Sequence, residues 1–169
     1  FTIHNLAYQG IYPKEALYWA GVDYRFHYPA SPFEFWGKVN LMKVGIECAD
    51  RVTTVSERYA LEIQSSPEFG YGLEGVLRTR RHDLVGIVNG IDYGTWSPAT
   101  DPLIPAHFSS RNLAGKARCK AELLKHFGFD PAQDAIPLVG MVSRLADQKG
   151  LDLIAEAMQE IIHLDVKFV

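Results

Sequence analysis

The sequence predicts an α/β protein built from βα units around a parallel sheet. Short runs rich in Val and Ile alternate with longer amphipathic stretches, and a Pro- and Gly-rich segment without periodicity separates two such regions. The 169 residues are 47% hydrophobic and 12% aromatic, which is enough for one ordinary core or for parts of two adjoining domains. We therefore expect a globular chain that contributes to two sheets.

Three short aliphatic runs predict strands: residues 51–55 (RVTTV), 84–88 (LVGIV) and 137–143 (PLVGMVS). Residues 1–3 and 165–169 each resemble half of a further strand, with no turn before the first or after the last. Because a domain would not naturally stop at either place, we expect the chain to be the central piece of a longer protein.

Apolar residues at helical spacing predict three amphipathic helices that pack on sheets. The second covers about 113–124, ahead of Gly128 as a C-terminal stop, and the third begins at Leu151. Ser56 is the expected N-cap of a further helix that runs to Ile63. The first of the three spans about 35–49, on a stripe formed by Phe35, Val39, Met42, Ile46 and Ala49.

The stretch from 90 to 105 is crowded with Gly, Pro, Ser and Asp, and it reads as a connection. We place the domain boundary between residues 88 and 89. Residues 1–88 then end one α/β domain, and residues 89–169 hold the connection and the first part of a second.

Composition argues against several classes of function. The sequence has 17 Lys and Arg and 20 Asp and Glu, and no segment concentrates the basic residues. Nucleic acid is therefore not expected as a partner. The sequence has no apolar run of about 20 residues, so no membrane span is expected. No GxGxxG follows a predicted strand, the patterns GxxxxGK[ST], GxSxG and HExxH do not occur, and there is no CxxC pair, so we expect neither a bound cofactor nor a metal site.

The first candidate site is the segment His4-Asn5-Leu6-Ala7-Tyr8-Gln9-Gly10, just beyond the first strand. Ligands of open α/β sheets bind at the carboxyl ends of strands. An imidazole and an amide there can together hydrogen-bond several sugar hydroxyls. The alternative is that His4 and Asn5 only satisfy backbone groups in a turn.

The second candidate site joins residues 137–143 to the helix at Leu151, and it carries Arg144 and Lys149. Two cations near a helix N-terminus could bind a diphosphate leaving group and stabilise its developing charge without a metal. The alternative is an ordinary surface ion pair.

Two weaker candidates contain glycines. Gly70-Tyr71-Gly72 could bring backbone close to a ligand, or could simply be a flexible loop. Asn89-Gly90 ends a strand at the expected boundary, where Asn-Gly is first of all a turn former.

Five segments, in this order, resemble bacterial glycogen synthases and the related plant starch synthases. They are HNLAYQG at 4–10, FWGKVNLMKVGIECADRVTTVS at 35–56, YGLEGVL at 71–77, GIVNGIDYGTWSP at 86–98 and SRLADQKGLDL at 143–153. Together they cover nearly the whole chain, and the segments are long and specific.

The resemblance implies a fold of GT-B type, in which two Rossmann-like domains face a deep cleft. Residues 1–88 would belong to the acceptor-side domain and 89–169 to the nucleotide-sugar side. By the same resemblance His4 reaches the transferred glucose, Arg144 and Lys149 hold the donor's diphosphate, and Asn89 contacts the sugar. The loop Gly70-Tyr71-Gly72 lies close to the sugar, and Asn5 would join it in substrate binding.

The implied reaction transfers glucose from a nucleotide-sugar to the non-reducing end of an α-1,4-glucan. We expect the donor to be ADP-glucose, with UDP-glucose as the alternative. Anomeric configuration is retained, and neither a cofactor nor a metal takes part. The family's lysine-glycine-glycine loop and an acidic donor-site residue fall outside residues 1–169, so this fragment alone is expected to be inactive. A bacterial parent would be cytoplasmic and a plant parent plastidial.

Two other functions stay open. Aromatic residues such as Tyr18, Trp19 and Tyr24 could make the chain a non-catalytic glucan-binding module, since aromatic faces stack on sugar rings. A different retaining two-domain glycosyltransferase, such as a sucrose-forming enzyme, is the closer alternative.

Overall fold

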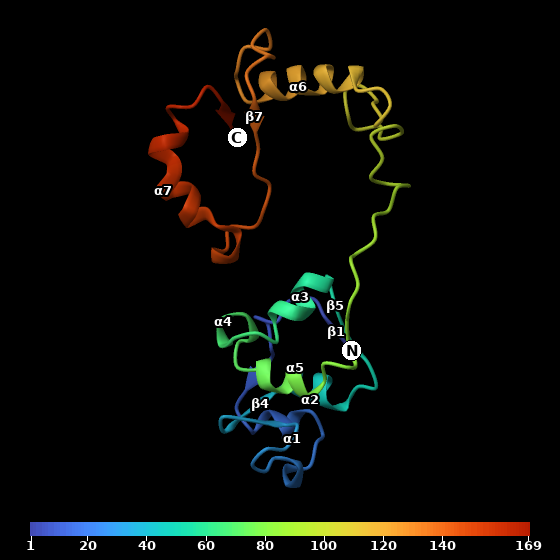
Figure 1. The fold of residues 1–169 in the computed structure, drawn as a ribbon, viewed down its shortest axis with the longest axis vertical. Helices are drawn as coiled ribbons and strands as arrows, with labels where there is room; N and C mark the ends of the chain where they lie inside the picture. Colours follow the sequence, from blue (N-terminus) through green and yellow to red (C-terminus); the bar gives the residue numbers. More distant parts are fainter. The chain divides into compact units, whose positions relative to one another are not determined.

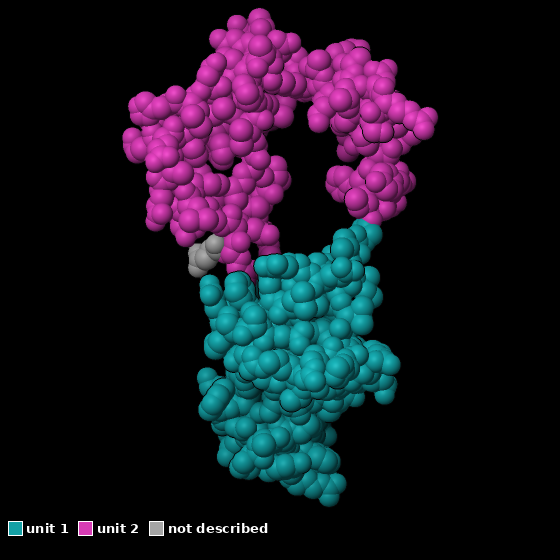
Figure 2. All heavy atoms as spheres, viewed as in Figure 1, with its two compact units in different colours: residues 1–90 teal, residues 91–169 magenta. Residues whose placement is uncertain are grey.

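The computed structural model describes the backbone of all 169 residues and every side chain except that of Asp147. The chain forms two compact units, residues 1–90 and 91–169, coloured separately in Figure 2. The division lies close to the boundary placed between 88 and 89 from the sequence. The assignment of the units to acceptor and donor sides stays a prediction.

A parallel three-stranded sheet forms the centre of the first unit (Figure 1). Its strands are β1 (Thr2–Ile3), β5 (Val52–Thr54) and β6 (Leu84–Gly86), in the order β1-β5-β6. The predicted α/β class is therefore confirmed. Strands β5 and β6 are both shorter than the runs predicted at 51–55 and 84–88. Val88 lies beyond the end of β6 and is 73% exposed.

Helices α2 (Leu41–Cys48), α3 (Glu57–Glu62) and α5 (Glu74–Thr79) pack with this sheet. Helices this short gain most of their stability from such packing rather than from intrinsic propensity. Ser56 caps α3 as predicted, because its hydroxyl accepts from the N–H of Tyr59 at 2.9 Å. The buried core consists of Ile3, Leu6, Ile46, Val52, Ala60, Ile63, Leu73, Leu77 and Leu84.

The predicted helix over 35–49 is wrong in its first third. A hairpin of β3 (Glu34–Phe35) and β4 (Lys38–Asn40) occupies that part, and it pairs with β2 (Ile11–Tyr12) in an antiparallel sheet. Trp36 and Gly37 form the hairpin turn with positive φ of 51° and 78°, which a right-handed helix excludes. The helix begins only at Leu41, where the Asn40 side chain accepts from the N–H of Lys43 at 3.0 Å.

Arg80 closes the other end of α2. Its guanidinium donates to the carbonyls of Ile46, Glu47 and Ala49 at 2.8, 2.8 and 2.6 Å, groups that the helix itself leaves without partners. Asp83 accepts from Arg80 Nε at 3.2 Å, and the side chain of Arg80 is 19% exposed. A residue from α5's C-terminal cap thus fixes the end of α2.

Short elements complete the first unit. They are α1 (Ala16–Trp19), a 3₁₀ turn (Tyr24–Phe26) and α4 (Pro67–Gly70).

The second unit contains α6 (Ala114–His126), α7 (Leu151–Ile161) and a parallel pair of strands, β7 (Leu138–Val139) and β8 (Lys167–Phe168). Gly128 stops α6 as predicted, with φ of 76°. The N–H of Phe129 then reaches back to the carbonyl of Leu124 at 2.9 Å.

The predicted strand over 137–143 is wrong in its second half. Its described partner, β8, pairs with Leu138 and Val139, and the last backbone bond runs from the N–H of Met141 to the carbonyl of Val169 at 2.9 Å. Val142 is fully exposed. Residues 142 and 143 therefore have no strand partner within the described part of the chain.

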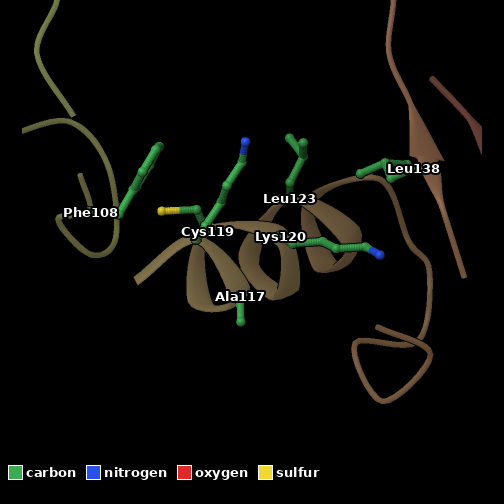
Figure 3. A pocket seen from close by; sticks show the side chains of 7 residues that line it. Phe108, Ala117, Cys119, Lys120, Leu123 and Leu138 are labelled. Atoms are coloured by element: carbon green, nitrogen blue, oxygen red, sulfur yellow. The ribbon is translucent and has the colours of Figure 1, made fainter. Parts of the chain in front are cut away.

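A groove of about 430 Å³ follows α6 in the second unit (Figure 3). Phe108, Cys119, Leu123 and Leu138 line it with apolar surface. Lys120 beside it donates to the carbonyl of Ile136 at 2.6 Å, which ties α6 to the start of β7. The groove contains none of the site residues predicted from the sequence.

The end of β6 makes a close backbone contact that can be tested by substitution. A Cβ at Gly86 would lie 2.3 Å from the carbonyl carbon and oxygen of Ser56, and backbone atoms cannot rotate away. We expect Gly86→Ala to lower the free energy of unfolding of the full-length protein by about 3 kcal/mol.

The control is Gly75→Ala, because a Cβ at that position of α5 meets nothing within 4 Å. We expect it to leave stability unchanged or to raise it by up to about 1 kcal/mol. Urea denaturation of both variants checks the difference, and equal midpoints would contradict the close contact.

Candidate active site

Polar residues follow two strands of the parallel sheet at the edge where the strands end. His4 comes directly after β1, and Asn89 lies just beyond β6. The chain leaving β6 is still held to the sheet, since the N–H of Ile87 donates to the carbonyl of Thr54 at 2.7 Å. Because parallel strands present their carboxyl ends at one edge, His4 and Asn89 share that edge, and both are exposed.

The loop after β1 is held by its own turn and by α3. Asn5 Oδ1 accepts from the N–H of Ala7 at 3.0 Å, so the turn-forming role left open for Asn5 is present in the structure. The buried Leu6 side chain anchors the loop in the core, and the N–H of Leu6 donates to the Tyr59 hydroxyl at 3.1 Å. His4 is thereby fixed at its backbone while its ring stays exposed.

The glycine loop turns sharply after α4. Gly70 is buried, and a Cβ there would lie 3.0 Å from the carbonyl of Ile63. Tyr71 and Gly72 then have positive φ of 50° and 84°. The glycines are thus required by packing and by backbone conformation. Gly72 also lines a depression of about 210 Å³ together with Phe35 and Lys43.

A buried glutamine joins these two loops. Gln9 Nε2 donates to the carbonyl of Tyr71 at 3.1 Å, so the segment containing His4 lies against the glycine loop. Gln9 is 5% exposed, and sequence reasoning gave it no role of its own. Its position in the HNLAYQG segment was the only available signal, since nothing in the sequence links it to Tyr71.

Arg144 and Lys149 lie in the second unit, in one tight segment before α7. The N–H of Ala146 donates to the carbonyl of Arg144, and the N–H of Lys149 to that of Ala146, both at 2.9 Å. A 3₁₀ turn ends at Lys149, and Gly150 precedes α7 with φ of 70°. Arg144 stands beyond the end of β7 at Val139, which corrects the expectation that it leaves a strand directly. Both side chains are exposed.

The connection after Asn89 is ordered by a side-chain turn. Asp92 accepts from the Thr95 hydroxyl at 2.8 Å and from the N–H of Gly94 at 2.9 Å. These bonds to Thr95 and Gly94 lower the pKa of Asp92.

Among the described side chains, no group of three His, Cys, Asp or Glu is gathered as a metal ion would require. No helix in the described part of the chain is long and apolar enough to cross a membrane.

A parallel sheet with polar loops at its carboxyl edge, followed by a second unit with parallel strands, is the arrangement of Rossmann-like α/β proteins. Residues 1–79 match the family model of the starch synthase catalytic domain. The resemblance of this chain to the glycogen and starch synthases, expected from the sequence, is thereby confirmed.

Two bacterial relatives illustrate the similarity. The glycogen synthase of Opitutus terrae is 54% identical over 154 residues, which cover 91% of this chain and 32% of that protein. The glycogen synthase of Anaeromyxobacter dehalogenans (strain 2CP-C) is 49% identical over 170 aligned positions, covering all of this chain and 35% of that protein. The chain therefore spans about a third of the length of the curated relatives it matches.

A solved structure agrees with these relatives. The catalytic domain of starch synthase IV from Arabidopsis thaliana, bound to ADP and acarbose, is 37% identical with a TM-score of 0.90. The match covers 99% of this chain and 34% of that one. The predicted GT-B type of fold is confirmed, and the chain is a piece of it.

The bond from Leu6 to Tyr59 predicts a measurable effect on stability. Tyr59→Phe removes the hydroxyl and leaves the partly buried Leu6 N–H without its acceptor. We expect the free energy of unfolding to fall by about 1 to 2 kcal/mol. Tyr18→Phe is the matched control, since Tyr18 is 70% exposed, and it should change stability by less than about 0.5 kcal/mol. Thermal denaturation of the full-length variants measures both, and an unchanged midpoint for Tyr59→Phe would refute the anchoring role.

Proposed function

We propose that the full-length protein is a glucosyltransferase that moves glucose from ADP-glucose to the non-reducing end of an α-1,4-glucan, with retention of configuration. The observation that carries the proposal is the match over 99% of this chain to a starch synthase catalytic domain bound to ADP and acarbose. The glycogen synthases among the bacterial relatives support the same reaction. A cytoplasmic location follows if the source is bacterial.

The proposed donor site lies at the segment before α7. Arg144 and Lys149 would bind the diphosphate of the nucleotide-sugar, helped by the helix dipole at the N-terminal end of α7. As the bond to glucose breaks, negative charge grows on the diphosphate, and fixed cations stabilise it most at that moment. With the charge balanced in this way, the proposed reaction needs neither a metal nor a cofactor.

The proposed sugar site lies at the carboxyl edge of the β1-β5-β6 sheet. His4 would hydrogen-bond a hydroxyl of the transferred glucose, while Asn5 and Asn89 would contact the sugar nearby. The backbone of Gly70, Tyr71 and Gly72 would border this site. The exposed ring of His4 and the bond from Gln9 to the glycine loop support this placement.

A glucan-binding role without catalysis is the second candidate. It is favoured by one observation, the exposed aromatic pair Tyr18 and Trp19, which are 70% and 83% exposed with ring centroids 5.6 Å apart. Such faces can stack on sugar rings.

A donor panel on the full-length protein decides between the candidates. ADP-glucose and UDP-glucose are each supplied with glycogen primer, with and without EDTA, and released nucleoside diphosphate is measured. We expect turnover with ADP-glucose that exceeds that with UDP-glucose and that EDTA leaves unchanged. Glucan binding without turnover of either donor would overturn the proposal in favour of the binding module, and loss of activity in EDTA would overturn the metal-free reaction.

The diphosphate role predicts the effect of two substitutions. Arg144→Ala and Lys149→Ala should each lower kcat by about 10²-fold, because each removes a contact to charge that develops in the transition state. Arg118→Ala and Lys125→Ala on α6 remove the same kinds of charge elsewhere in the second unit and should leave kcat within about twofold. Steady-state kinetics on all four variants provides the comparison. Equal kinetics for Arg144→Ala, Lys149→Ala and wild type would exclude the diphosphate role.

His4 offers a separate test of the sugar site. If its ring contacts the glucose as the glycosidic bond breaks, His4→Ala should lower kcat more than it raises KM. If His4 only supports the turn, the variant should lose about 1 kcal/mol of stability and keep its turnover per folded molecule. His82→Ala, at another exposed histidine, is the control. Measuring kcat and Tm on one preparation separates the outcomes, and a normal kcat with a lowered Tm would falsify the catalytic assignment.

A further inference from the structure

Two buried amide side chains form a continuous polar link through the first unit. Asn40 is fully buried and Gln9 is 5% exposed. Asn40 Nδ2 donates to Gln9 Oε1 at 2.6 Å, and Gln9 Nε2 donates to the carbonyl of Tyr71 at 3.1 Å. The partners of Gln9 lie 31 and 62 residues away in the sequence, so the link joins three separate segments.

The link is anchored at the start of α2. Asn40 Oδ1 accepts from the N–H of Lys43 at 3.0 Å, and the backbone carbonyl of Gln9 accepts from the N–H of Met42 at 3.0 Å. Gln9 is therefore held by α2 through both its side chain and its main chain. A buried amide that lost one partner could not replace it with water, so each bond in this link restrains the next.

At the other end of the link, Gln9 Nε2 bonds to a strained residue of the glycine loop. Tyr71 has φ of 50°, a left-handed conformation that costs a residue other than glycine about 1 to 2 kcal/mol. Half of its surface is exposed, so little packing holds it there. The bond from Gln9 to the Tyr71 carbonyl is placed to hold this peptide group.

We propose that Gln9 is a positioning residue that keeps the Gly70-Tyr71-Gly72 loop and the His4-Asn5 loop in one fixed relation. Gln9 lies in the same segment as His4, and its buried side chain donates a hydrogen bond to the backbone of the glycine loop. It does not contact substrate, and its effect passes through the backbone of the two loops. This inference rests on the proposed function, in which both loops border the transferred glucose.

The test replaces Gln9 without changing its size. Gln9→Met removes both polar groups, whereas Gln9→Glu keeps the acceptor for Asn40 and removes the donor to Tyr71. In the full-length protein we expect both variants to lower kcat for ADP-glucose and glycogen by about 10- to 100-fold, since a misplacement of about 1 Å at the reacting groups has that effect. KM for ADP-glucose should change by less than about threefold, because the proposed diphosphate site lies elsewhere in the chain.

Gln64→Met is the matched control. Gln64 Nε2 donates to the carbonyl of Ala60 at 2.6 Å, which is also a bond from a glutamine to a carbonyl but stays within one short stretch of chain. It should lower Tm without lowering kcat per folded molecule. A Gln9 variant that behaves like this control, with reduced Tm and normal kcat, would overturn the positioning role.

A double-mutant cycle with His4→Ala tests the proposed route of action. If Gln9 acts by placing the His4 loop against the glycine loop, Gln9→Met should lower kcat much less in the His4→Ala background than in wild type. Fully additive losses would overturn the coupling. If Gln9→Met does not fold, Gln9→Glu in the same cycle gives the answer. An inactive wild type would instead refute the proposed function, whereas a His4-sensitive enzyme indifferent to both Gln9 variants would refute only this inference.

Discussion

The start of α2 is the constraint on which the first unit depends. The N–H groups of Leu41, Met42 and Lys43 have no partners within the helix, and they are taken by the carbonyl of Gly10, the carbonyl of Gln9 and the side chain of Asn40. The segment after β1 and the end of β4 are therefore both held at one helix terminus. These three bonds help to fix the end of the hairpin and the last residues of the segment that carries His4.

The remainder of α2 extends this control. The ammonium of Lys43 donates to the carbonyls of Ser31 and Glu34 at 2.8 Å each, which holds the chain leading into the hairpin. Its side chain is only 10% exposed, so these bonds offset the loss of hydration. A helix of eight residues thus holds segments that lie before it in the chain and, through Arg80, one that lies after it.

Local patterns in the sequence were sufficient for much of the fold. Ser56 and Gly128 mark a helix start and a helix stop through chemistry that acts within a few residues. The half-buried stripe of α7 also follows directly from its spacing. Periodicity failed between Phe35 and Val39, because apolar residues four apart fit a strand, turn and helix start as well as they fit a continuous helix. Gly37 and Asn40 were the available signals of a turn and a cap.

The candidate site divides in the same way. His4 and Asn89 could be placed at one edge from the sequence, since parallel strands end together wherever the intervening helices run. The bond between Gln9 and Tyr71 could not, because it depends on how two distant loops pack. The distance between Arg144 and the end of β7 could not be predicted either, because the length of β7 depends on its pairing with β8, which is distant in sequence.

The closure of α2 by Arg80 has a consequence for how this position can vary. Four carbonyls and a carboxylate surround this planar guanidinium, which donates to them from Nε and from both terminal nitrogens. Lysine would preserve the charge at this position, but its point-like ammonium cannot reach the same set of acceptors at once. Shape rather than charge is therefore what the fold selects here, and a substitution usually regarded as conservative would leave the end of the helix open.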